Sequence, residues 1–439
     1  MPTLSWGTLA PEKIEPTRRV RSLGVGAAVR SFNDRAVPGL GGIWYGKQIL
    51  NPLLGIHAAQ LARAAGRRDI RNIPVANAVE ALGCYIALER NGWTADARVR
   101  GKNKMQGQQD LRFKNVVKPT FYVTQPFRPA AIQPLLALDL VEGSSERFND
   151  FSLSDELGKR FVDTAYGGAR TRKPVSDILL AWIMGELDEP TKNAALKEAL
   201  SPCEVMPNDA RSFLRNQLKQ AHDEYERRRG DAWDWVSSVS TADDISWDKK
   251  PPQIADDHWT DLEVGALFFR ARTAAIDLLE DIEQLIEKRE RKSLDLHESL
   301  PDELAERVSV LRQRSQAFLA REHDPSDGNV ATKFCLENAQ PSTEEVLRSL
   351  CERDGRVLKL NEQRIVPGPA FRGTRLVRDV TANADEDVSN VAFRSEIRWP
   401  DGISNRIRNL WLLQLDLQGQ LNSWLGNIAR EEDQNDEEN

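Results

Sequence analysis

Cysteine and histidine are scarce in this chain of 439 residues. There are four cysteines and five histidines, with no C-x-x-C pair and no H-x-x-x-H pair. Zinc sites and disulfide frameworks normally need such spacings, so we expect no metal, no cofactor and no disulfide scaffold. Scattered cysteines of this kind are typical of a reducing compartment.

Long apolar runs are also missing. The most apolar run, ILLAWIMG at 178–185, is far shorter than the roughly 20 residues that span a bilayer. The first residues, MPTLSWGTLAPEKIEP, do not show the basic-then-apolar pattern of a secretion signal. We therefore expect a cytoplasmic protein that makes no membrane contact.

Catalytic motifs are few and incomplete. No G-x-S-x-G occurs, and the loop from Gly39 to Gln48 only partly fits the phosphate-binding pattern G-x-x-x-x-G-K. Gln48 stands where that pattern requires a Ser or Thr to hold magnesium, and the polar run before the loop ends in Pro38 instead of forming a buried strand. The glycines are better explained by a tight turn that leads into a helix, with Trp44 and Tyr45 packing.

Charge is distributed unevenly, although the net charge is only −7. Residues 1–133 hold 20 Lys and Arg against 8 Asp and Glu, whereas the remainder holds 40 against 59. Six of the nine residues at 431–439 are acidic. Basic surface attracts polyanions by Coulomb attraction and counterion release. The asymmetry predicts contact with nucleic acid or an acidic partner; mutual attraction of the two halves is the alternative.

Residues 98–118 are the most basic part of the chain, with seven cations and one acid. Glycines and glutamines between them predict an exposed loop of the kind that lies along a phosphate backbone. A solvated loop without function is the alternative. The predicted nucleic-acid contacts are Arg98, Arg100, Lys102, Lys104, Arg112, Lys114 and Lys118.

Residues 126–165 predict a helix, two short strands at 140–142 and 151–153, and a second helix capped by Ser154. This order resembles the second half of a winged-helix domain. The resemblance implies that the first helix and the hairpin contact DNA, the hairpin along the backbone. Further contacts would then come from Arg128, Gln133 and Arg147. Pro134 should kink the helix, and Gln133 is its one base-edge reader, so sequence-specific readout is not expected. A protein-docking role is equally compatible with the same fold.

Most other segments predict helices. Helices are expected at 43–66, 74–91, 175–200 and 207–229, and the tryptophan-rich stretch 231–259 is expected to be a loop. Capping boxes at Thr260/Glu263 and Ser342/Glu345 predict two further helix starts, and Gly355 predicts a helix end before a strand pair.

The fold class expected is therefore mainly α (α+β), a multi-domain helical protein with one or two small winged-helix units. Its expected parts are a basic helical region 1–125, a winged-helix-like unit 126–170, a helical domain 171–325 containing a long helical hairpin 260–321, a second small α+β unit 326–400, a C-terminal amphipathic helix 401–430 and an acidic tail 431–439.

One short motif points to an enzyme. Arg215 and His222 are spaced as on one face of a predicted helix, which resembles the Arg-x(4–6)-His motif of HEPN ribonucleases. Matches this short often arise by chance. The favoured hypothesis is a non-enzymatic subunit that binds nucleic acid, DNA before RNA, largely without sequence preference. It would engage other protein subunits or a second copy, as accessory proteins of bacterial DNA-transaction and phage-defence systems do.

Overall fold

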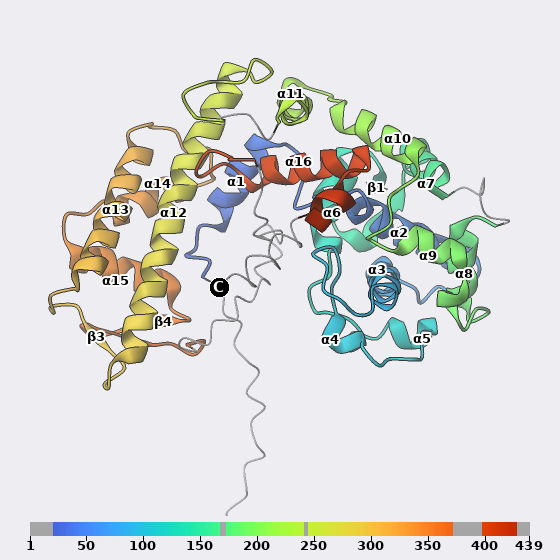
Figure 1. The fold of residues 1–439 in the computed structure, drawn as a ribbon, viewed down its shortest axis with the longest axis horizontal. Helices are drawn as coiled ribbons and strands as arrows, with labels where there is room; N and C mark the ends of the chain where they lie inside the picture. The colour runs from blue at the N-terminus through green and yellow to red at the C-terminus, as the bar shows by residue number, and fades with distance from the viewer. Residues whose placement is uncertain (1–20, 167–172, 241–244, 372–396, 428–439) are drawn as a thin grey trace, which may run out of the picture. The chain divides into compact units, whose positions relative to one another are not determined.

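The computed structural model describes residues 21–166, 173–240, 245–371 and 397–427. The fold is mainly helical with only small antiparallel sheets, which confirms the predicted class (Figure 1). The chain divides into unit 1, Met1–Ala27 with Arg270–Asp379, and unit 2, Ala28–Phe269 with Val380–Asn439. The boundary thus passes through the predicted hairpin 260–321 instead of enclosing it.

Unit 2 is built around two adjacent helices, α2 (Lys47–Ala64) and α3 (Asn72–Arg90). Small residues allow their close approach: a Cβ on Gly55 would lie 2.5 Å from the Cα of Ala76. Both helices match their predicted ranges within a few residues. Further helices that lie wholly or mostly in unit 2 are α1 (Gly26–Ala36), α4 (Lys102–Met105), α5 (Phe113–Val116), α6 (Arg128–Ala137), α7 (Leu157–Tyr166), α8 (Val175–Met184), η2 (Pro190–Lys192), α9 (Ala194–Leu200), α10 (Asn208–Lys219), α11 (Glu224–Ser238) and α16 (Asn405–Gln418).

The predicted hairpin is present between α6 and α7. Strands β1 (Val141–Gly143) and β2 (Phe151–Leu153) pair antiparallel, with Val141 opposite Leu153 and η1 (Phe148–Asp150) in the connection. The Ser154 hydroxyl donates to the Asp139 carbonyl at 2.6 Å and accepts the Gly158 amide at 2.8 Å. The predicted cap therefore also ties the end of the hairpin back to its beginning.

Two predicted helices are each divided. The helix expected at 175–200 stops at Gly185, whose φ is +81°, and α9 starts after Asn193, whose side chain accepts two backbone amides. The helix expected at 207–229 stops at Lys219, and α11 starts after Asp223, which caps Glu226 N. Both breaks follow from short polar side chains that cap a new helix.

The tryptophan-rich stretch 231–259 was predicted as a loop; residues 239–240 and 245–255 have no helix, but both ends of the stretch are helical. Trp233 and Trp235 lie in α11, and Trp259 lies in α12 (Asp256–Lys288), where its ring meets Trp235 at 6.2 Å. Because α12 begins at Asp256, Thr260 is inside the helix and donates to the Asp256 carbonyl at 2.9 Å. The capping box predicted at Thr260 was therefore wrong.

In unit 1, helices α13 (Asp302–Leu319), α14 (Val330–Asn338) and α15 (Thr343–Asp354) accompany the unit 1 part of α12 (Figure 1). Strands β3 (Leu294–Asp295), β4 (Leu358–Asn361) and β5 (Arg364–Pro367) form one sheet in the order β3-β5-β4. Ser342 caps α15, and Gly355 ends it with a φ of +55°, so both predicted signals hold.

Removing the cap at Ser342 should weaken unit 1 without affecting unit 2. The Ser342 hydroxyl accepts the Glu345 amide at 3.3 Å, and loss of an N-cap typically costs about 1 kcal/mol. We expect Ser342→Ala to lower the free energy of unfolding of unit 1 by that amount in urea titrations. Ser342→Asp, which restores an acceptor, should recover it; equal loss in both variants would contradict the capping role.

The C-terminal amphipathic helix is shorter than predicted. Helix α16 ends at Gly419, whose φ is +79°, and residues 421–427 are helical again. Its apolar side chains, including Ile407, Leu410 and Leu413, are buried in the core of unit 2. The acidic tail 431–439 and residues 372–396 of the predicted second α+β unit lie outside the described residues.

Candidate nucleic-acid interface

The basic segment 98–118 is a docked element and not a free loop. Its apolar side chains Met105, Phe113 and Val116 are buried. The Phe113 ring meets Trp182 of α8 edge-on at 5.2 Å, and the Trp182 indole donates to the Leu111 carbonyl at 2.9 Å. Short helices α4 and α5 are therefore held against the body of unit 2, which leaves the polar side chains between them outside.

Five of the seven predicted cations of this segment are exposed. These five exposed side chains form what we call the basic patch: Lys102, Lys104, Arg112, Lys114 and Lys118. Arg112 is neutralised in part, since its guanidinium contacts the Asp110 carboxylate at 2.7 Å. The Lys104 ammonium donates to the Tyr122 carbonyl at 3.0 Å, which fixes its position but leaves its charge. Asp110 is the one acid in the segment, so the segment itself carries a net positive charge, although Asp188 from another part of the chain also acts on Arg112.

Arg98 and Arg100 do not belong to this patch. Arg98 is only 5% exposed, and its guanidinium is held by Asp96 at 2.8 Å and by Asn422. Arg100 lies over the Phe127 ring at 3.9 Å and donates to the Gln125 carbonyl. Exposure of Arg98 was therefore wrongly predicted, because charge along the chain does not reveal partners brought in by folding.

The contacts predicted in α6 are turned inward as well. Arg128 donates to Asn77 at 3.0 Å and lies over Phe148 at 4.9 Å. The N-terminus of α6 is fixed by the buried Glu80 carboxylate, which accepts the Phe127 and Arg128 amides. Burial raises the pKa of Glu80, although these hydrogen bonds oppose the rise.

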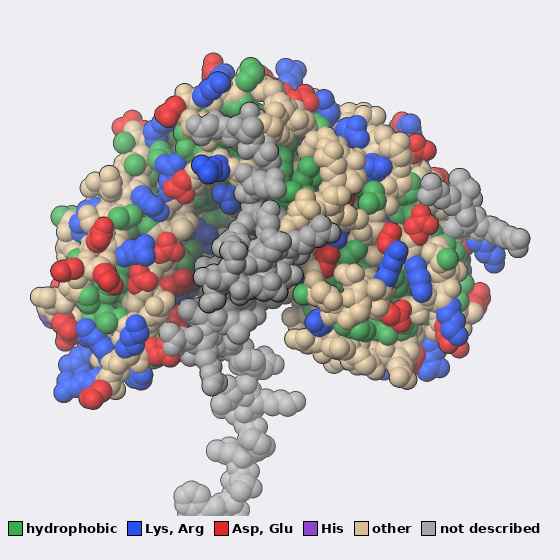
Figure 2. Space-filling model, in the orientation of Figure 1, with side chains coloured by type: hydrophobic (Ala, Val, Ile, Leu, Met, Phe, Trp, Pro, Cys, Tyr) green, Lys and Arg blue, Asp and Glu red, His purple; other side chains and the backbone are tan. Residues whose placement is uncertain are grey.

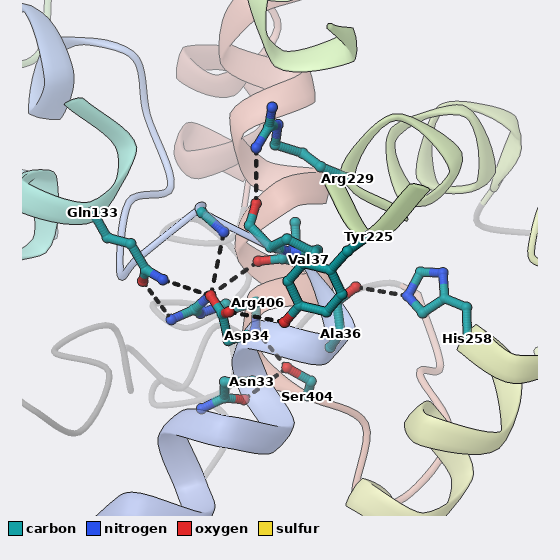
Figure 3. A network of polar contacts seen from close by, with 12 residues as sticks. Asn33, Asp34, Ala36, Val37, Gln133, Tyr225, Arg229, His258, Ser404 and Arg406 are labelled. Atoms are coloured by element: carbon teal, nitrogen blue, oxygen red, sulfur yellow. Dashed lines mark hydrogen bonds and ion pairs between the residues drawn. The ribbon is translucent and has the colours of Figure 1, made fainter. Parts of the chain in front are cut away.

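Gln133, the expected base-edge reader, belongs to a polar network inside unit 2 (Figure 3). Its amide nitrogen donates to Asp34, and its oxygen accepts from Arg406 at 2.8 Å. Arg406 also donates to Asp34 and to the Val37 carbonyl, at 2.8 and 3.0 Å. Helix α6 therefore uses its polar side chain to join α1 and α16. Of the residues taken from the winged-helix resemblance, Arg147 alone is exposed.

The glycine loop is filled by protein atoms. Lys47 is 2% exposed, and its ammonium donates to the carbonyls of Glu198 and Ser201 at 2.7 and 2.9 Å. Burial lowers the pKa of Lys47 to about 7, against the opposing charges of Glu204, Asp416 and other nearby groups. The Gly46 amide donates to the Asp416 carboxylate at 2.8 Å. A carboxylate thus takes the place that a phosphate would need, and the loop is a packing element, with Trp44 and Tyr45 buried beside it.

The two residues of the ribonuclease hypothesis make separate contacts. Arg215 in α10 donates to the Leu417 carbonyl at 3.3 Å. His222 lies beyond the end of α10, and its Nε2 contacts the Asp139 carboxylate at 2.7 Å. That contact raises the pKa of His222. The predicted placement on one helical face was wrong, because α10 ends three residues earlier, at Lys219.

The described part of the chain holds no cluster of metal-binding side chains. No group of three His, Cys, Asp or Glu side chains is arranged there to hold a metal ion. The four cysteines are free thiols. Among the helices of the described ranges, none has the length and apolar character to cross a bilayer. On the face shown in Figure 2, basic and acidic side chains are interspersed on each unit, so the basic patch is a local feature.

One local sequence pattern would have identified the paired arginines. In Asp96-x-Arg98 and Asp110-x-Arg112, one carboxylate oxygen accepts both the backbone amide and the Nε of the arginine two residues later. The other oxygen accepts Nη2, at 2.8 and 2.7 Å. An arginine in this pattern is neutralised locally, so the four lysines of the basic patch are the stronger candidates for binding phosphates.

Comparisons with protein-family models, curated proteins and solved structures find no match for this chain.

Proposed function

We propose that unit 2 binds the phosphate backbone of nucleic acid through the basic patch, as a non-enzymatic subunit of a larger assembly. The observation that carries this proposal is the exposure of Lys102, Lys104, Lys114 and Lys118 on a docked segment whose one acid already pairs with Arg112. Lysine ammonium groups neutralise phosphates and release counterions, which provides affinity without sequence information.

Weak sequence preference follows from the surroundings of the patch. The aromatic ring of the segment, Phe113, is buried and cannot stack on a base. Arg128 and Gln133, which would reach base edges in a winged-helix complex, bond within the protein. We take duplex DNA as the partner, in keeping with the winged-helix resemblance, with RNA as the comparison ligand.

Two small substructures support the winged-helix part of this proposal. In unit 2 the hairpin β1-β2 lies between α6 and α7. In unit 1 a short turn joins α14 to α15, and a hairpin whose strand β5 also pairs with β3 follows. Helix α15 begins with Glu344 and Glu345, which would repel phosphates, so we assign unit 1 to contact with other protein subunits. A bacterial DNA-transaction or phage-defence complex would combine such parts.

Charge reversal tests the proposal directly. We expect Lys102→Glu, Lys104→Glu, Lys114→Glu and Lys118→Glu together to weaken duplex DNA binding at least about tenfold at low salt and to flatten its salt dependence. Fluorescence anisotropy over a series of salt concentrations measures both effects.

The control moves the same charge change elsewhere. Lys197, Lys249, Lys333 and Lys359 are exposed outside the basic patch, and their joint replacement by glutamate leaves the patch intact. If both quadruple variants lose the same affinity, net charge and not the patch governs binding. If the wild type shows no salt-sensitive association with DNA or RNA, the proposed function is wrong.

A further inference from the structure

The described chain is anchored next to the basic segment shortly before it reaches its acidic residues. The Arg98 guanidinium donates to the Asn422 side chain, whose amide donates to the Cys203 carbonyl at 3.2 Å. Arg98 precedes the first lysine of the basic patch by four residues. Residues 421–427 therefore lie near the start of that segment.

The residues that follow have the opposite charge. Positions 431–439 read EEDQNDEEN, with six carboxylates in nine residues. An extended chain spans at most about 3.3–3.6 Å per residue, so the twelve residues after 427 reach about 40 Å. This length is sufficient to bring the carboxylates to lysines that begin four residues from the anchor.

We propose that the acidic segment 431–439 docks on the basic patch of its own chain and competes there with nucleic acid. This inference rests on the proposed function of the patch, for which it supplies a regulation. Closely spaced carboxylates resemble a run of phosphates to Lys102, Lys104, Lys114 and Lys118. A short tether holds such a segment at a high effective concentration near its target. Nucleic acid then binds only the fraction of molecules with an uncovered patch, so its apparent affinity falls in proportion.

Neutralising the acidic segment tests the competition. The variant carries Glu431→Gln, Glu432→Gln, Asp433→Asn, Asp436→Asn, Glu437→Gln and Glu438→Gln in the full chain. We expect it to bind duplex DNA at least about fivefold more tightly than wild type at low salt, with a gain that shrinks as salt screens the contact. Unchanged DNA affinity would overturn the inference while leaving the proposed function intact.

A matched variant separates competition from net charge. It neutralises six exposed acids of unit 1, namely Glu290, Glu303, Glu306, Glu322, Asp327 and Glu352. We expect it to gain less than twofold in DNA affinity. An equal gain in both variants would show that the loss of negative charge as such, and not an uncovered patch, increases binding.

Zero-length carbodiimide cross-linking detects the contact without DNA. We expect amide bonds between the carboxylates of 431–439 and the patch lysines, identified by mass spectrometry and lost at 0.5 M salt. Mixing ¹⁵N-labelled with unlabelled chains shows whether the acidic segment on the patch belongs to the same chain or to a second copy. Cross-linked products that contain both isotopes would assign the contact to a second copy and overturn docking within one chain. Cross-links without any DNA binding would instead place the failure in the proposed function; absence of these cross-links would refute docking.

Discussion

Replacing Arg406 with methionine is expected to lower the free energy of unfolding of unit 2 by about 3–5 kcal/mol. The Arg406 side chain is almost fully buried and donates to Asp34, Gln133 and the Val37 carbonyl. Methionine fills a similar volume but leaves these acceptors without their donor. Removing one member of a buried ion pair is costly because the remaining charge stays in a poorly solvated place.

The pH dependence of this loss has a defined sign. Burial raises the pKa of Asp34, but the charge and hydrogen bonds of Arg406 and the hydrogen bonds from Tyr225 and Gly39 outweigh burial and leave the pKa lowered. A lowered carboxyl pKa contributes stability above the unfolded value, and this contribution disappears as the pH falls through the folded pKa. The difference between wild type and Arg406→Met should therefore narrow in acid.

Urea titrations followed by circular dichroism measure the effect. Arg227→Met is the matched control, because Arg227 is exposed on α11 and surface changes usually stay within about 0.5 kcal/mol. Arg406→Lys keeps the charge but loses the planar fork, so its loss should be intermediate. A loss below about 1 kcal/mol for Arg406→Met would show that the network does not stabilise unit 2.

Acidification from pH 6.5 to 4 is expected to destabilise wild type by about 3 kcal/mol more than His258→Gln. His258 is fully buried at the start of α12, and its Nε2 lies 2.9 Å from the Ala36 carbonyl, to which it must donate. Its Nδ1 has no hydrogen-bond partner among the described residues, so the ring is neutral. Burial lowers the pKa of His258 to about 4, with Arg228 adding to the effect and the Ala36 hydrogen bond, Asp261 and Asp257 opposing it.

The direction of this pH effect on stability follows from proton uptake by His258. Below about pH 6.5 the unfolded chain binds a proton at His258, whereas the folded chain binds it only below about pH 4. Stability therefore rises with pH across this window and is lost on acidification. Glutamine cannot take up the proton but can still donate to the Ala36 carbonyl. The stability curve of His258→Gln should therefore lack the loss on acidification that His258 causes.

Chemical denaturation of both proteins at intervals of half a pH unit tests the prediction. Other titrating groups contribute equally to both stability curves, so the difference between the curves reports His258. Parallel curves for His258→Gln and wild type between pH 6.5 and 4 would refute the assignment of a neutral buried imidazole.

Local signals in the sequence were sufficient for much of the secondary structure. Apolar periodicity predicted α2 and α3, and pairs of short strands about a polar turn predicted both hairpins. Capping at Ser342 and the stop at Gly355 depend on atoms within one helical turn, so they could be read directly. Predictions failed where a capping asparagine or aspartate divided a helix, as at Asn193 and Asp223.

The candidate site could not be predicted to the same extent. Arg98 and Arg112 follow the same Asp-x-Arg pattern and make the same local pair, yet Arg98 is buried and Arg112 is exposed. Folding also brings Asn422, 324 residues away in the chain, to the Arg98 guanidinium. Gln133 was chosen for its chemistry as a base reader, but Arg406, 273 residues later, occupies its oxygen.

The sequence alone determined the helical class, the hairpins, the caps at Ser154 and Ser342 and the positive charge of residues 98–118, because each depends on neighbours along the chain. Only the tertiary structure decided which of those charges face solvent, because burial and pairing depend on residues that folding brings together. The pair between Asp34 and Arg406 joins residues 372 positions apart. No local pattern encodes such a pair, and the same is true of the Asp416 carboxylate that accepts the Gly46 amide in the glycine loop.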